Sequence, residues 1–185
     1  MYKTLLKAFL MLSLAMVHVV QGYAQDQMTT VTLASPQAMP GNRTYVTSLL
    51  TNSAEISVYH LQHRLEFSQD KLTLVSTRLG IAANLANAVL TVEEQPGAET
   101  NEGGNAVLIL TIKGDNAIPD GPVVEATFDV AHIAPQTIVL PHQLEAFDEQ
   151  GEKISGVVFS DAEVHVSADQ PDLPPAIFAC LFYMH

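Results

Sequence analysis

Between Ile56 and Phe67 the chain alternates apolar and polar side chains, and this pattern constrains the fold more than any other feature. Successive side chains of a β-strand point to opposite faces, so a period of two over this length indicates a strand with one buried face. The residues expected to face inward are Tyr59, Leu61, His63, Leu65 and Phe67. The residues expected to face solvent are His60, Gln62, Arg64 and Glu66.

Shorter segments repeat this period and are separated by clusters of Gly, Pro, Asn and Asp, which favour turns. The expected strands are near residues 31–33, 44–50, 72–77, 88–94, 107–113, 123–130, 137–140 and 157–166. The expected turns are at residues 40–42, 95–97, 101–104, 119–121 and 148–151. Residues 79–88 are rich in Ala and Asn and predict one short turn of helix or a loop. Eight or nine strands with such frequent turns predict an all-β, antiparallel sandwich or barrel.

The N-terminal residues have the layout of a secretory signal peptide. Lys3 and Lys7 precede an apolar run from Ala8 to Val20, and small residues at Gly22 and Ala24 provide a cleavage site after Ala24. The run is shorter than the about 20 residues that a membrane-spanning helix needs. We therefore expect residues 1–24 to be removed and the protein to be secreted, to the extracellular space or the cell surface.

The remaining chain divides into a domain and a tail. Residues 25–168 contain all the expected strands, whereas residues 169–185 form a Pro-containing linker and a short apolar tail. The apolar run in the tail, from Ala176 to Met184, is too short to span a bilayer as a helix. We expect the tail to lie outside the core and the mature chain to have no membrane span.

Composition excludes two classes of protein. The chain carries 8 basic and 20 acidic residues, giving a net charge of −12, whereas nucleic-acid binding needs clustered Lys and Arg. Cys180 is the single cysteine, so the fold cannot depend on an intramolecular disulfide.

The sequence contains no motif for catalysis, a metal or a cofactor. His60 and His63 lie three residues apart on the expected strand and would point to opposite faces, so they could not share one ion. Asp148–Glu152 has a glycine but only part of a calcium ligand set. A carboxylate pair for glycoside hydrolysis is defined by the distance between the two groups, which the sequence does not give. The simpler interpretation of Glu93-Glu94 and Asp148-Glu149 is that they are solvated charges. We expect a protein that is not an enzyme.

Four blocks, taken in order, resemble the cohesin domain, the receptor module of cellulosome-type assemblies. The first is Pro40-Gly41-Asn42 and the alternating strand that ends in Leu50-Thr51-Asn52. The second is Leu65-Glu66-Phe67 followed by Asp70-Lys71-Leu72, where the family has Asp-Pro. The third is Asp120-Gly121 with the strand Ala126-Thr127-Phe128-Asp129-Val130. The fourth is the segment 146–154 with a closing strand at Val164–Val166, and together the blocks cover about residues 29–166.

The resemblance implies a jelly-roll-like sandwich of about nine strands that recognises a dockerin-like protein. In cohesins the dockerin docks on one sheet face, to which polar residues of the long third strand contribute. The matching residues here are His60 and Gln62, with Arg64 and Glu66 continuing the outward row. Well-known members carry small acidic or amide side chains at the first two positions. A simpler interpretation is that these four residues are only the solvated face of a sheet.

The resemblance also implies a setting and a competing function. Cohesins belong to extracellular assemblies that degrade polysaccharides, and related carbohydrate-binding modules share the same sandwich. A sugar-binding face usually needs exposed flat aromatic rings, whereas this chain has no Trp and 6% aromatic residues. The alternative hypothesis is therefore a carbohydrate-binding module that binds polysaccharide.

Overall fold

The computed structural model describes residues 28–53, 55–100 and 103–168, so the expected signal peptide and tail lie outside the described residues. These residues form twelve strands and one short helix. The elements are β1 (Thr30–Leu33), β2 (Gln37–Ala38), β3 (Arg43–Thr51), β4 (His60–Ser68), β5 (Leu72–Leu79), α2 (Ile81–Leu85), β6 (Val89–Thr100), β7 (Gly103–Lys113), β8 (Gly121–Val130), β9 (Gln136–Leu140), β10 (His142–Phe147), β11 (Val158–Phe159) and β12 (Ala162–Val166). The all-β prediction is confirmed.

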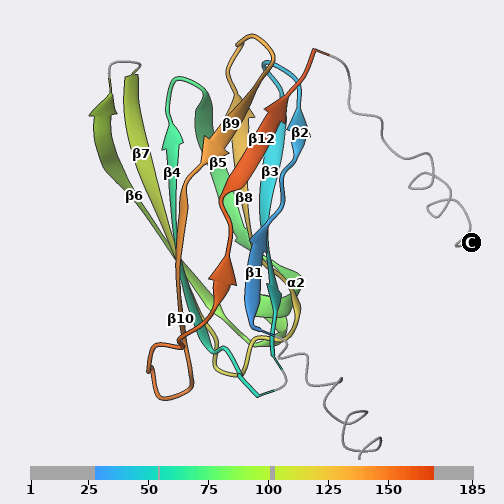
Figure 1. Cartoon of the computed structure of the whole chain (residues 1–185), viewed down its shortest axis with the longest axis vertical. Helices are drawn as coiled ribbons and strands as arrows, with labels where there is room; N and C mark the ends of the chain where they lie inside the picture. The colour runs from blue at the N-terminus through green and yellow to red at the C-terminus, as the bar shows by residue number, and fades with distance from the viewer. Residues whose placement is uncertain (1–27, 54, 101–102, 169–185) are drawn as a thin grey trace, which may run out of the picture.

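The strands form three sheets (Figure 1). Their orders are β11-β1-β3-β8-β5, β10-β4-β7-β6 and β2-β12-β9. Most neighbouring strands are antiparallel, but β1 pairs with β11 and β2 pairs with β12 in parallel. The sandwich is therefore not purely antiparallel, because the first two strands lie beside the last two.

One buried core joins the three sheets. Along β3 and β4 the buried and exposed positions alternate, as the sequence predicts. The strand expected from Ile56 begins only at His60, and Tyr59, expected to face inward, is half-buried before it. Phe67 of β4 and Phe128 of β8 meet edge to face, with ring centroids 5.2 Å apart and planes inclined by 67°. Strands from opposite sheets thus contribute to the same apolar interior, and two packed layers around a single core are the usual way in which sheets bury their apolar faces.

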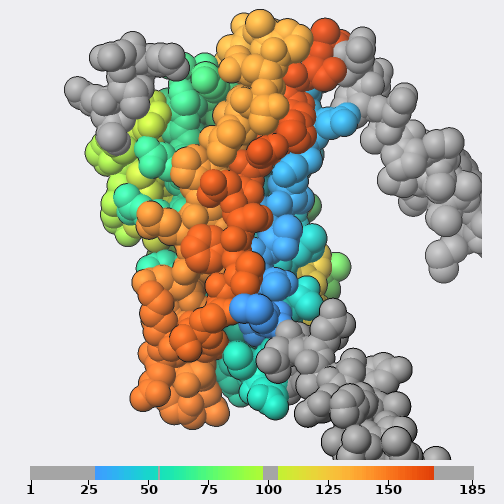
Figure 2. Space-filling model, viewed as in Figure 1, coloured from blue at the N-terminus to red at the C-terminus, as the bar shows by residue number. Residues whose placement is uncertain are grey.

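A single stretch of chain passes from the small sheet to the four-stranded sheet at Pro141. Before it, β9 pairs with β12; after it, β10 pairs with β4. The chain from β9 to β12 forms a band along the molecule in Figure 2. The sequence analysis did not identify β2 or β10, and it treated β11 and β12 as one strand, so the described residues form twelve strands where about nine were expected.

The turn predicted at residues 95–97 is wrong. Those residues continue β6, and the pairing with β7 shifts register between Pro96 and Glu99 before resuming with Glu99 opposite Gly104. A proline is tolerated there because β6 is an edge strand, where one missing ladder hydrogen bond costs little. The helix-like stretch 79–88 contains only α2, which packs beside β8. Among the described residues no helix is long and apolar enough to cross a membrane.

Candidate binding face

The outward row of β4 lies in the middle of the four-stranded sheet, between β10 and β7. Arg64 is exposed, and the other three members of the row are half-buried. The buried residues that alternate with them are Leu61, His63, Leu65 and Phe67. The structure therefore places His60, Gln62, Arg64 and Glu66 together on one surface, while their role in binding stays a prediction.

Cross-strand neighbours extend this row into a continuous surface, which we call the β4 face. On β10 the neighbours are Gln143, Glu145 and Phe147. On β7 they are Asn105, Val107, Ile109, Thr111 and Lys113, and the residues of β6 beyond them are Val89, Thr91, Glu93 and Gln95. The face thus combines charged and amide side chains with the half-buried Ile109 near its centre, whereas Val107 is only 3% exposed.

The three carboxylates of the β4 face that lie around Arg64 already have partners. Glu66 accepts a hydrogen bond from the Asn105 amide at 2.9 Å. The Lys153 ammonium lies 2.7 Å from Glu145, and the Gln95 amide donates to Glu93 at 2.7 Å. These contacts fix the acidic groups in place and reduce their attraction for other cations.

His60 lies at one end of the row and packs against an aromatic ring. Its imidazole is 5.0 Å from the Phe147 ring, with the planes tilted by 38°. Burial, and then the nearby charge of Lys113, lowers the pKa of His60. His60 is therefore neutral at pH 7 and contributes a flat surface with little charge.

A groove of ≈ 280 Å³ crosses the edge strand β10 beside the row. It is lined by Gln62, Arg64, Gln143, Leu144, Glu145 and Phe159. Two of the four predicted residues, Gln62 and Arg64, thus border a concave site. The sequence could not show this groove, because β10 and Phe159 are brought to β4 only by the fold.

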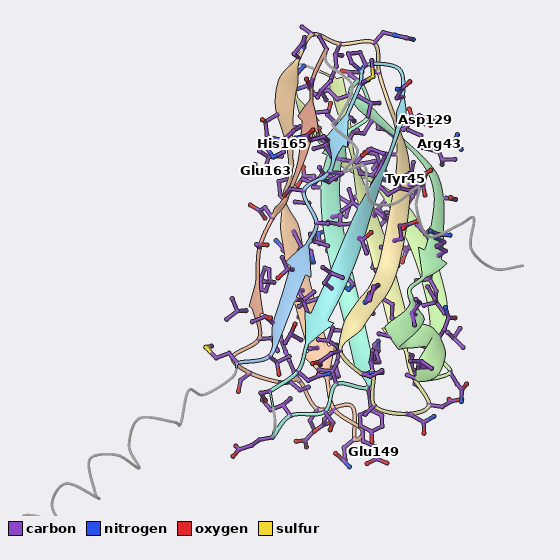
Figure 3. All side chains as sticks on the ribbon, turned by 90° about the vertical axis from the view of Figure 1, so that its right-hand side faces the viewer. Arg43, Tyr45, Asp129, Glu149, Glu163 and His165 are labelled. Atoms are coloured by element: carbon purple, nitrogen blue, oxygen red, sulfur yellow. The ribbon has the colours of Figure 1, made fainter. Side chains whose placement is uncertain are left out.

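A second groove, of ≈ 510 Å³, lies on the outward face of the five-stranded sheet next to α2. Its arginine, Arg78, is bound to Glu125 at 2.8 Å. Further along the same sheet Arg43 lies 2.9 Å from Asp129, and Figure 3 shows the two side chains together near Tyr45. The cations of this face are therefore already neutralised.

The described residues contain no cluster of three or more His, Cys, Asp or Glu side chains that could hold a metal ion. His60 is half-buried on the β4 face, whereas His63 is fully buried inside, so the prediction that the two point apart is confirmed. The segment Asp148–Glu152 is a tight turn, in which the Asp148 carboxylate accepts a hydrogen bond from the Glu152 backbone at 2.8 Å.

His142 is a residue of this region that the sequence analysis missed. It is 4% exposed and packs edge to face against Phe159, which lines the groove, and its Nε2 lies 3.1 Å from Nδ1 of His63. No local pattern marks this contact, because the two histidines are far apart in the sequence and meet only when β10 pairs with β4.

The chain matches no known family model and no curated protein sequence, but it is similar to solved structures. The third ScaC cohesin of Acetivibrio cellulolyticus, solved in complex with the ScaB dockerin, is 21% identical with a TM-score of 0.59, and the alignment covers 75% of this chain and 99% of that one. The seventh ScaB type I cohesin of Pseudobacteroides cellulosolvens is 18% identical with a TM-score of 0.58, covering 79% and 96%.

A third similar structure is a non-cellulosomal cohesin from the hyperthermophilic archaeon Archaeoglobus fulgidus. It is 17% identical with a TM-score of 0.55, and the alignment covers 76% of this chain and 91% of that one. Nearly the whole length of each of these cohesins is matched by residues of this chain. The protein therefore has the jelly-roll sandwich fold of a cohesin domain.

Proposed function

We propose that the protein is an exported, non-catalytic recognition module that binds a dockerin-like protein through the β4 face. The observation that carries this proposal is the position of the outward row of β4. It lies at the centre of an open sheet, in a fold shared with cohesins that were solved in complex with dockerins. The setting that fits is an extracellular assembly of the polysaccharide-degrading kind.

The composition of the β4 face supports a protein partner. Protein interfaces combine an apolar centre with a polar rim, and here the half-buried Ile109 is surrounded by amide and charged side chains. The described aromatic rings of this face and its groove are Phe147, which lies against His60, and the exposed Phe159, which packs edge to face on His142. A sugar-binding face would instead present a free flat ring, so these residues favour the protein partner over polysaccharide.

Calorimetry with purified dockerin modules tests the proposal. The panel would contain the dockerins encoded in the genome that carries this gene, together with the ScaB dockerin of Acetivibrio cellulolyticus. We expect at least one module to bind, and we expect Gln62→Ala with Arg64→Ala to weaken that binding at least tenfold, since central interface residues cost about 2 kcal/mol when truncated. Both residues are on the surface, so the fold should lose only about 0.5 kcal/mol per site.

The matched control is Thr47→Ala with Arg78→Ala, which removes a polar residue and an arginine from the groove on the five-stranded sheet. This variant should bind like the wild type. Retention of the protein on cellulose or chitin, with no dockerin bound, would show that the carbohydrate-binding alternative is correct.

We also propose that residues 1–24 direct export. The support is the order of basic, apolar and small residues in that segment. Mass spectrometry of protein recovered from the medium should give an N-terminus at Gln25, whereas a cell-retained, full-length chain would contradict the proposal.

A further inference from the structure

Arg64 differs from the other two arginines of the chain, all three of which lie within the described residues. Arg43 is paired with Asp129 and Arg78 with Glu125, each on the five-stranded sheet. Arg64 has no hydrogen bond or ion pair with any described residue, although the chain has far more acidic than basic residues. Its guanidinium therefore keeps all five N–H donors for a partner.

The acidic side chains near Arg64 on the β4 face form hydrogen bonds or ion pairs with residues other than Arg64. Glu66 lies two residues along the same strand and is bound by Asn105. Glu145 lies opposite Gln62 and is bound by Lys153, and Glu93 lies on β6 opposite Ile109 and is bound by Gln95. These three carboxylates thus lie on or next to the strand of Arg64 without forming an ion pair with it, so its guanidinium stays available for a partner.

The groove beside Arg64 suits a carboxylate. Gln143 of β10 lies directly opposite Arg64, and Gln62 lies two residues before Arg64 on the same face of β4. Both amide side chains line the groove beside the guanidinium. The one acidic residue that lines the groove is Glu145, whose charge is offset by Lys153. An arginine can bind a carboxylate through two parallel hydrogen bonds, which gives the contact a defined geometry.

We propose that Arg64 is the specificity-determining residue of the β4 face, and that the groove takes an Asp or Glu side chain of the partner protein. This proposal rests on the proposed function. The occupant is a single carboxylate on an otherwise neutral or basic surface, because the net charge of −12 repels a strongly acidic partner. A partner with an amide or a lysine at that position leaves Arg64 desolvated and unpaired, so it is rejected.

Calorimetry on the same dockerin panel tests the proposal with three single substitutions. Arg64→Gln should weaken binding about 30-fold, the size expected for a central charged contact. Arg64→Lys should weaken it about tenfold, because lysine keeps the charge but not the paired hydrogen bonds. Arg78→Gln, in the other groove, is the matched control and should leave affinity unchanged. Raising salt from about 0.05 M to about 0.5 M should weaken the wild type more than Arg64→Gln.

The partner side completes the test. In the bound dockerin, each exposed Asp or Glu is replaced in turn by Asn or Gln, and one of these variants should bind wild type and Arg64→Gln equally weakly. Full affinity of Arg64→Gln, with binding still lost in Gln62→Ala or Thr111→Ala, would overturn the role of Arg64 and leave the docking face intact. Absence of binding by every dockerin would overturn both proposals. Retention in a polygalacturonate gel that Arg64→Gln abolishes would assign the groove to an acidic polysaccharide and would also overturn the proposal.

Discussion

Nδ1 of His63 lies 3.1 Å from Nε2 of His142 in the core, with the two rings stacked and their centroids 5.3 Å apart. Nδ1 of His142 lies 3.0 Å from the Ser160 carbonyl, which can only accept, so this nitrogen carries the proton. Burial lowers the pKa of both histidines, so both rings are neutral at pH 7. Nε2 of His142 is then an acceptor, and His63 donates to it. Nε2 of His63 is buried with no partner among the described residues.

The first prediction is that the protein loses stability in mild acid. Burial, and then the neighbouring His142, lowers the pKa of His63 to about 3, and burial lowers that of His142 although Ser160 and Asp161 oppose this. Unfolded histidine titrates near pH 6.5, so below that pH the unfolded chain binds more protons than the folded chain. The stabilisation is complete above about pH 6.5 and is lost as the pH falls towards 3, at about 1.4 kcal/mol per pH unit for His63.

Urea unfolding at several pH values between about 7.5 and 4 measures this effect. Between about pH 6.5 and 5 the free energy of unfolding should fall by about 2 kcal/mol from His63 alone. The variant His63→Leu with His142→Leu removes both partners and should flatten that slope. A wild-type slope equal to that of the variant would show that the pair is not held neutral.

The second prediction concerns the core. Phe67 is 2% exposed and packs on Phe128, so Phe67→Ala should lower the free energy of unfolding by about 3–5 kcal/mol. Leu49 is 39% exposed on β3, and Leu49→Ser should change stability by less than about 0.5 kcal/mol. Thermal melts of the two variants would contradict the register of β4 if Phe67→Ala melted like the wild type.

The third prediction separates two costs of replacing glycine. A Cβ on Gly80 would collide with the Pro122 carbonyl, whose chain is fixed in β8, so Gly80→Ala should cost about 3 kcal/mol. Gly151 has φ +79° and open space around it, so Gly151→Ala should cost only the left-handed penalty of about 1 kcal/mol. Chemical denaturation compares them, and equal losses would mean that the close approach at Gly80 relaxes freely.

The fourth prediction is that removal of residues 171–185 leaves the melting temperature within a few degrees. The last described strand, β12, already pairs with both β2 and β9. The deletion should also raise solubility, because it removes an apolar run and the free thiol of Cys180. Calorimetric melts and the soluble yield would check this, and an unfolded product would place the domain boundary further along the chain.

The regular strands could be predicted because their side chains alternate over many residues. β10 could not, since its inward residues include the polar His142 and the small Ala146, and Pro141 separates it from β9. Pro96 and Gly97 indicated a turn, because the sequence does not show that β6 is an edge strand.

The candidate site divides in the same way. The alternation of apolar and polar residues along β4 was sufficient to predict that Gln62 and Arg64 lie on the same face. The groove beside them depends on β10 and Phe159. The carboxylates near Arg64 are bound by Lys153, Asn105 and Gln95, which come from other strands and loops. Contacts between distant segments are set by tertiary packing, which a local pattern does not encode.

The parallel pairing of β1 with β11 and β2 with β12 has a consequence for the order in which the chain folds. β12 is the one described strand that pairs with β2, and Gln37 of β2 lies opposite His165 of β12. This pairing can therefore form only after nearly the whole domain has been synthesised. Pairings between such distant segments also make folding slow, since a long loop must close first. In a nascent chain of this topology β2 has no partner among the described strands, and the small sheet cannot form, until β12 emerges.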